Sequence, residues 1–464
     1  MKKTTLYSFS ILFLLCLGVF FINRYQTHDW GDDFALYLMQ AQKTASFQLQ
    51  FPTHYVFNEL NPLVAPTFYP PVFSIFLSIL YPVLKTDISN YIIVIHLLLL
   101  LNVLLFWHYL KSKYSHFLVI ALCLLWAYNP WILHFKNEVM SEFLFVTFLI
   151  LFYINYTKKK NLLLLIILGA LLISTRSVGW AIIPALLAIS FLKKDWRESL
   201  LICVGILLVS GIINLLFTGQ ISGANYSSNF KWDEIFITTQ SNLQFYFKHI
   251  YNWFIPYLET KNFLILPTQF ITLGLLLLGL YSVLKAKKYL IEILFSSFYM
   301  ILILIYPYQG AGFRFLVPII PIMLLLFAEA ITFLKNHITN TYLKNVFYYG
   351  IPLFFLLQYY PNIKYLIASK TEPDGPYTTE TLQVWEAIKL NTTPKDTIYF
   401  TYPKAQALLT YRYSKAFPEA NESKINYFLD DVNSPNNFVK QLKNSRKFDT
   451  LWTNKRFTLF KKIE

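Results

Sequence analysis

The 464-residue chain carries little charge: Asp, Glu, Lys and Arg make up 14% of it, whereas soluble globular domains carry about 25%. A water-exposed surface over the whole chain is therefore excluded. Instead, 56% of the residues are hydrophobic, and apolar runs of about 18 residues or more recur along the chain, as is typical of transmembrane helices. The composition predicts an all-α polytopic membrane protein.

Several motif classes are also missing. The sequence contains no P-loop, no dinucleotide-binding fingerprint and no nucleophile elbow, and its histidines lack the spacing of a zinc site. The formal net charge is +15, but the cations lie in short clusters between apolar runs, so nucleic-acid binding is not expected. The only three cysteines lie within apolar runs without metal-site or disulfide spacing, and we interpret them as buried hydrophobic residues: Cys16, Cys123 and Cys203.

The loops between the apolar runs predict the topology. Lys and Arg gather in alternate loops, as the positive-inside rule requires of cytoplasmic loops. The first run follows Lys2 and Lys3 and lacks a small-x-small cleavage site, so we expect an uncleaved signal anchor with a cytoplasmic N-terminus. About eleven spans are expected, over residues 6–22, 91–110, 116–134, 139–156, 161–174, 178–192, 198–217, 263–284, 290–307, 314–334 and 345–367.

This topology requires that residues 66–84 do not cross the membrane. After Tyr69-Pro70-Pro71 the segment has only about a dozen apolar residues, a length that favours a re-entrant or interfacial helix. If it did cross, every later loop would change sides. Without that crossing, residues 23–90 form the first outer loop.

The C-terminal residues differ in composition from the rest. From residue 368 onward, polar residues increase and long apolar runs end. The pattern predicts a helix over 379–390, a strand over 397–401 and a short helix over 403–410. We therefore predict two domains, a transmembrane module over 1–367 and a small extracytoplasmic α/β domain over 368–464.

Paired carboxylates follow the first apolar run. Asp32 and Asp33 lie in the stretch Asp29–Tyr37, where acidic groups beside a membrane helix face water or take part in chemistry. A carboxylate here could deprotonate a hydroxyl acceptor or hold a divalent cation. The structural alternative is that they are hydration anchors at the interface.

Glu138 and Glu142 are expected to mark the outer end of the fourth span. Residues four apart on a helix share a face, and Glu142 lies inside an apolar run, where an ionisable group is costly. The structural alternative is an ion pair with Arg176 or Lys136.

Two arginines are expected at the same membrane face. Arg176 lies in a short outer turn, and Arg314 opens the tenth span. A planar guanidinium suits phosphate because it donates two parallel hydrogen bonds. The alternative is that each arginine anchors the chain among lipid headgroups.

Taken together, these motifs resemble the GT-C glycosyltransferases, and within them the group of protein O-mannosyltransferases and the lipid A aminoarabinose transferase (family 39 type). That group has an acidic residue in the first outer loop followed four residues later by Tyr, which Asp33 and Tyr37 match. Phe34 follows Asp33 where many relatives have Glu, so Asp32 is available to replace that acid.

Further matches lie along the membrane part, in the order that the family shows. Aminoarabinose transferases usually have Lys before the paired prolines, and Tyr69 stands at that position here. A phosphate contact by this residue is therefore an open question. In the tail, Lys404 and Arg412 resemble remnants of basic motifs in some bacterial relatives. The other matching segments are Phe68-Tyr69-Pro70-Pro71, Ser141-Glu142, Thr175-Arg176 and Arg314-Phe315-Leu316-Val317-Pro318.

The resemblance implies a transferase that moves a hexosyl or pentosyl group from a polyprenyl-phosphate-linked donor to a hydroxyl acceptor at the outer face of the membrane. Arg176 and Arg314 would hold the donor phosphate, Asp33 with Asp32 would act as general base, and Glu142 would orient a substrate. If carboxylates bind a cation, Mg or Mn is expected. Additional candidates for substrate binding are Tyr37, Tyr69, Glu138, Lys404 and Arg412.

Two other classes remain open: a flippase or transporter for a lipid-linked sugar, and an O-antigen-type polymerase. A transporter should carry charges or broken helices near mid-membrane, whereas the charges here gather at one face, which favours the enzyme. The expected partners are the lipid-linked donor, membrane lipids and a glycan, lipid or protein acceptor of the cell envelope. The expected location is the bacterial inner membrane.

Overall fold

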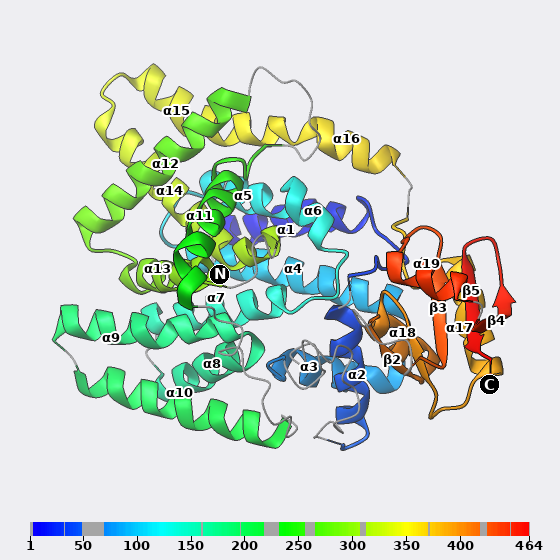
Figure 1. Ribbon diagram of the computed structural model, residues 1–464. Coiled ribbons are helices and arrows are strands. Elements are labelled where there is room, and N and C mark those ends of the chain that lie inside the picture. The colour runs from blue at the N-terminus through cyan, green and yellow to red at the C-terminus, as the bar shows by residue number, and fades with distance from the viewer. Residues whose placement is uncertain are drawn as a thin grey trace. The chain divides into compact units, whose positions relative to one another are not determined.

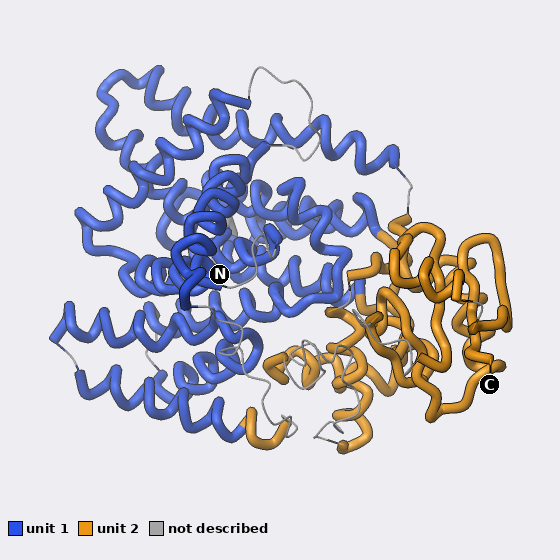
Figure 2. The backbone as a smooth tube through the Cα atoms, viewed as in Figure 1, with its two compact units in different colours: residues 1–24, 92–212, 229–371 blue, residues 25–91, 213–228, 372–464 orange. Residues whose placement is uncertain are grey.

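The computed structural model describes residues 3–31, 33–48, 69–158, 161–194, 196–217, 232–255, 265–306, 312–369, 372–417, 425–445 and 447–463. Figure 2 shows the two compact units of the chain. Unit 1 comprises residues 1–24, 92–212 and 229–371, and unit 2 comprises residues 25–91, 213–228 and 372–464. Unit 2 therefore combines most of the predicted first outer loop with the C-terminal segment.

The regular elements described in unit 1 are all helices (Figure 1). Each of the eleven predicted apolar runs is largely helical where it is described, because apolar residues in lipid favour a backbone that satisfies its own hydrogen bonds. The α-helices are α1 (Lys3–Leu17), α4 (Ile88–Leu110), α5 (His116–Ala127), α6 (Pro130–Phe135), α7 (Glu142–Lys158), α8 (Leu162–Thr175), α9 (Ile182–Lys193), α10 (Trp196–Phe217), α11 (Ile235–Tyr251), α12 (Ile265–Ala286), α13 (Leu290–Leu304), α14 (Ile320–His337), α15 (Thr341–Gln358) and α16 (Tyr360–Ala368).

Four described helices are long and apolar enough to cross a membrane: Ile88–Leu110, Trp196–Phe217, Ile265–Ala286 and Phe313–His337. The last combines the 3₁₀ helix η7 (Phe313–Ile319) with α14. Other apolar runs form shorter helices. For example, the run over 116–134 divides where the Asn129 side chain accepts from the Trp131 amide and Pro130 begins α6. A multi-pass helical architecture is therefore confirmed, and the number eleven stays a prediction.

A glycine allows α12 and α14 to pack closely. A Cβ atom added at Gly279 would lie 2.0 Å from the carbonyl oxygen of Leu326. Small residues at such contacts let two membrane helices approach each other. Gly274, on the same helix, has nothing within 4 Å of its Cβ position.

Unit 2 contains a five-stranded sheet with the order β2-β1-β3-β5-β4. β1 pairs in parallel with β2 and β3, whereas β5 is antiparallel to β3 and β4. The two predicted helices and the strand of the tail are confirmed. The elements are α2 (Asp33–Ala45), α3 (Val72–Leu84), α17 (Thr379–Asn391), β1 (Thr397–Tyr399), α18 (Pro403–Thr410), β2 (Tyr413–Lys415), β3 (Tyr427–Asp431), α19 (Asn437–Asn444), β4 (Phe448–Thr453) and β5 (Phe457–Lys462).

Alternation along the strands gives the sheet two apolar faces. Ile398 packs with Val384 and Ile388 of α17, while its neighbour Tyr399 belongs to a second cluster with Leu442 of α19. Because successive strand residues point to opposite faces, each face buries its own cluster. The predicted small α/β domain therefore has helices on both sides of its sheet. The predicted non-crossing segment over 66–84 contains α3, a 13-residue helix, and its relation to the membrane stays a prediction.

We predict that Gly279→Ala destabilises the protein by about 1–3 kcal/mol, because the added methyl group forces α12 and α14 apart. Thermal unfolding in detergent measures the change. Gly274→Ala is the matched control, and it should leave the melting temperature unchanged or slightly raised, since alanine favours helix more than glycine does. Equal effects of the two substitutions would contradict the proposed close contact.

Candidate active site

The Asp33 carboxylate is the centre of a polar cluster in unit 2. Asp33 is the first residue of α2, where the helix dipole favours negative charge. The Tyr69 hydroxyl donates to Asp33 Oδ1 over 2.8 Å, and Lys404 Nζ lies 3.8 Å from the same oxygen. The side chain of Asp33 is 17% exposed and that of Lys404 is 8% exposed, so the carboxylate is held in place and remains accessible.

Tyr37 supports this arrangement from the next turn of α2. Its ring centroid lies 5.1 Å from that of Tyr69 and 4.8 Å from that of Phe73. Residues four apart on a helix share a face, so the spacing of Asp33 and Tyr37 places both beside Tyr69. Asp32 and Phe68 lie outside the described residues.

The two basic residues predicted in the tail have different surroundings. Lys404, in the first turn of α18, reaches Asp33. Arg412 instead donates to the carbonyl oxygens of Lys389 and Thr392 over 3.0 and 2.9 Å. These carbonyls end α17, where cationic donors stabilise a helix. The structure therefore brings Lys404 to the carboxylate and uses Arg412 to cap a helix.

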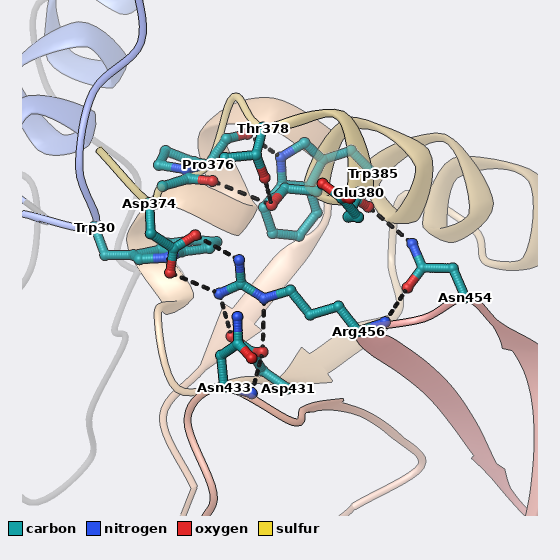
Figure 3. Close-up of polar contacts among 12 residues, drawn as sticks. Trp30, Asp374, Pro376, Thr378, Glu380, Trp385, Asp431, Asn433, Asn454 and Arg456 are labelled. Atoms are coloured by element: carbon teal, nitrogen blue, oxygen red, sulfur yellow. Dashed lines mark hydrogen bonds and ion pairs between the residues drawn. The ribbon is translucent and has the colours of Figure 1, made fainter. Parts of the chain in front are cut away.

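An ion-pair network anchors the chain just before Asp33 (Figure 3). Arg456 donates through Nε and Nη2 to the two carboxylate oxygens of Asp431, each over 2.8 Å, and also binds Asp374. Trp30 Nε1 donates to Asp374 over 3.2 Å, and the indole ring stacks on Tyr402 at 4.4 Å. No local sequence spacing marks this set, because the four polar partners come from distant parts of the chain.

A second cluster, in unit 1, surrounds the Glu142 carboxylate. Glu142 is the first residue of α7 and its side chain is 0% exposed. Arg176, at the C-terminal end of α8, forms an ion pair with Oε1 through Nη1, and Arg314 Nε lies 4.0 Å from that oxygen. The guanidinium carbons of Arg176 and Arg314 lie 5.2 and 5.5 Å from the centroid of the buried Phe315 ring.

Two arginines, Arg176 and Arg314, share one buried carboxylate in this cluster, that of Glu142. The Arg314 side chain is 28% exposed and that of Arg176 is 11% exposed. Each guanidinium has five N–H donors in a planar arrangement that suits a carboxylate or a phosphate. The structural alternative for Glu142, an ion pair with Arg176, is therefore part of the same arrangement.

Glu138 does not share a helical face with Glu142. Helix α7 begins at Glu142, and Glu138 lies in the turn between α6 and α7. The argument from four-residue spacing was wrong at this point, because an apolar run does not specify where its first helical turn begins.

The described residues do not provide a divalent-cation site. Within the described ranges no group of three or more His, Cys, Asp or Glu residues converges. At Asp33 one neighbouring charged group is the Lys404 ammonium. A role for Mg or Mn stays a prediction, and we derive no step through a metal.

No protein-family model matches the sequence, and no curated protein sequence matches it either. Solved structures do match. The oligosaccharyltransferase AglB from Archaeoglobus fulgidus, solved with an inhibitory peptide and a dolichol-phosphate, is 14% identical, with a TM-score of 0.60 over 93% of this chain and 70% of that one. ArnT from Cupriavidus metallidurans bound to undecaprenyl phosphate is 12% identical, with a TM-score of 0.59 over 97% of both chains.

The apo state of the same ArnT gives a similar result, with 11% identity and a TM-score of 0.59 over 98% of both chains. Identities this low show the fold alone. Both AglB and ArnT have the GT-C fold, so the predicted GT-C fold of this chain is confirmed.

We predict that Arg456→Ala destabilises unit 2 by about 3–5 kcal/mol, because Asp431 would remain as a buried charge without its partner. Amide hydrogen exchange over residues 25–31 should become faster. Without Arg456, Asp374 is no longer fixed and no longer holds Trp30 in place. Lys443→Ala is the control: it breaks an ion pair with Asp430 whose lysine is 44% exposed, and such surface pairs contribute about 0–1 kcal/mol. Similar losses from both variants would contradict the anchoring role.

The Asp374 contact should depend on pH. Burial disfavours its charged form, but the hydrogen bond and charge of Arg456 outweigh this and hold the pKa of Asp374 below its usual value. Its contribution is therefore complete above the unfolded pKa of about 3.9 and is lost as the pH falls through the lower folded value. The difference in melting temperature between the wild type and Asp374→Asn should be constant from pH 7 to 5 and shrink below about pH 4. A constant difference down to pH 2.5 would contradict this explanation.

Proposed function

We propose that this chain is an integral-membrane glycosyltransferase that moves a sugar from a polyprenyl-phosphate-linked donor to a hydroxyl acceptor. The observation that carries this proposal is the arginine cluster, in which Arg176 and Arg314 both lie against the buried carboxylate of Glu142 and bring together two guanidinium groups of the kind that suits a phosphate. The GT-C fold adds support, because ArnT was solved with undecaprenyl phosphate and AglB with a dolichol-phosphate.

The donor phosphate would bind to Arg176 and Arg314. As the bond between the sugar anomeric carbon and the phosphate oxygen breaks, negative charge grows on the leaving polyprenyl phosphate. Guanidinium groups already in place stabilise that charge more in the transition state than in the ground state, which lowers the barrier. Glu142 fixes both arginines, because its buried charge requires them.

Asp33 would act as the general base. The acceptor hydroxyl oxygen forms the new bond to the anomeric carbon and its proton passes to the Asp33 carboxylate, in a single displacement that inverts the anomeric centre. Tyr69 and Lys404 hold the carboxylate through Oδ1, which fixes the position of the group that would accept the proton. Tyr37 supports Tyr69 by packing, and Asp32 is a further candidate acid.

The predicted topology places this reaction at the outer face of a bacterial inner membrane, with the N-terminus in the cytoplasm and residues 368–464 outside. The sorting of Lys and Arg among the loops supports this orientation. A hexosyl or pentosyl donor and an envelope glycan, lipid or protein acceptor are the proposed partners.

The test uses purified full-length protein, a panel of radiolabelled undecaprenyl-phosphate sugars and a membrane extract as acceptor. We expect label transfer with at least one donor, and Asp33→Asn should lower kcat by about 10²-fold or more while donor binding is retained. Transfer should persist in chelator if no metal takes part. If the protein binds donors but transfers label from none of them, and Asp33→Asn changes nothing, a flippase would be favoured instead.

A second variant tests the phosphate site. Arg314→Gln should weaken donor binding and lower kcat/KM by about 10²-fold, the loss typical of a donor to developing charge. Arg314 is preferable to Arg176, whose removal would leave Glu142 buried without its nearest partner. Arg197→Gln, at an exposed arginine of α10, is the matched control and should behave as wild type. Equal effects of the two variants would contradict a specific phosphate site.

A further inference from the structure

A cavity in unit 1 lies at the other end of α7 from the arginine cluster. Its volume is about 580 Å³, and its lining includes Thr157, near the last residue of α7. Glu142 begins the same helix, so a rise of 1.5 Å per residue separates the two ends by about 22 Å. The cavity is therefore distinct from the proposed donor phosphate site.

One of the side chains that line the cavity is a buried carboxylate. Glu329 of α14 is 6% exposed, and it accepts hydrogen bonds from Tyr114 over 2.6 Å and Ser282 over 3.2 Å. No cation forms an ion pair with it within the described ranges. A carboxylate offers about four acceptor positions, so two remain. Because a buried charge without a counter-ion is costly, a ligand that brings a cation to Glu329 would be stabilised.

Basic side chains line the same cavity. Lys113 Nζ lies 3.5 Å from the ring centroid of Tyr109 and 4.4 Å from that of Tyr289, which fixes its position. Lys288 and His337 are exposed lining residues. A cavity with a buried carboxylate and several basic groups suits a ligand that carries both a positive and a negative charge.

We propose that this cavity binds a headgroup with a phosphate and a primary ammonium, the chemistry of phosphatidylethanolamine. The ammonium would donate to Glu329, and the phosphate would bind Lys288 and Lys113. The cavity is lined by residues of α12 and α14, both within candidate membrane spans, and its volume lies within the range of small-molecule sites. In the predicted topology the lysine-rich loops at this end face the cytoplasm. This inference does not depend on glycosyl transfer.

The test measures binding of short-chain lipids to delipidated full-length protein by native mass spectrometry. We expect dihexanoyl phosphatidylethanolamine to bind about tenfold or more tightly than dihexanoyl phosphatidylglycerol, because only the former has an ammonium for Glu329. Glu329→Gln keeps the shape and an acceptor for Tyr114 but removes the charge, so the two lipids should then bind within about threefold of each other.

A pair of lysine variants completes the test and does not disturb the buried carboxylate. Lys288→Ala should weaken both lipids about fivefold or more, whereas Lys285→Ala, at an exposed residue of α12 outside the lining, should have no effect. Free phosphoethanolamine binding as tightly as the lipid would support the same chemistry with a soluble ligand. Equal binding of the two lipids by wild type, or equal effects of the two lysine variants, would overturn the proposal.

Discussion

The buried carboxylate of Glu142 is the constraint around which unit 1 is organised at its proposed site. An ion removed from water costs several kcal/mol unless opposite charge compensates it. Here α8 supplies Arg176 and η7 supplies Arg314, so three helical segments must meet at one point. The arrangement that stabilises the fold also brings together the two guanidinium groups that we propose bind the donor phosphate. Stability and the proposed function thus share the same groups.

In the ion-pair network of unit 2 one arginine binds two carboxylates, whereas in unit 1 two arginines share one. Arg456 binds two carboxylates, Asp431 and Asp374, and Asp374 is half exposed, so water takes up the remaining negative charge. The Arg456 guanidinium donates to these protein carboxylates, so the network is a structural connection and not a binding site. Through Trp30 the network fixes the chain that leads into Asp33, and Lys404 reaches the same carboxylate from the tail. The tail thus contributes directly to the geometry of the proposed base.

Helix α7 runs between two sites, and the carboxylate at each site has a different kind of partner. At its first residue, guanidinium groups compensate Glu142; near its last residue, the cavity presents Glu329 bound only by hydroxyl donors among its described contacts. Hydroxyl groups satisfy hydrogen bonds without neutralising charge, so the two carboxylates have different requirements for a ligand. Rigid helices keep these two chemistries apart along one scaffold.

The sequence by itself determined the helices of the apolar runs in unit 1, two helices and one strand of the tail, and the GT-C fold, because hydrophobic periodicity and backbone hydrogen bonds are local properties. It also selected Asp33, Tyr37, Arg176 and Arg314 through short motifs. Only the tertiary structure decided that α7 begins at Glu142 and leaves Glu138 in a turn, that Lys404 meets Asp33, that Arg412 caps α17, and that Arg456 connects Asp374 with Asp431. Ion-pair partners depend on which distant segments pack together, and no local pattern encodes that choice.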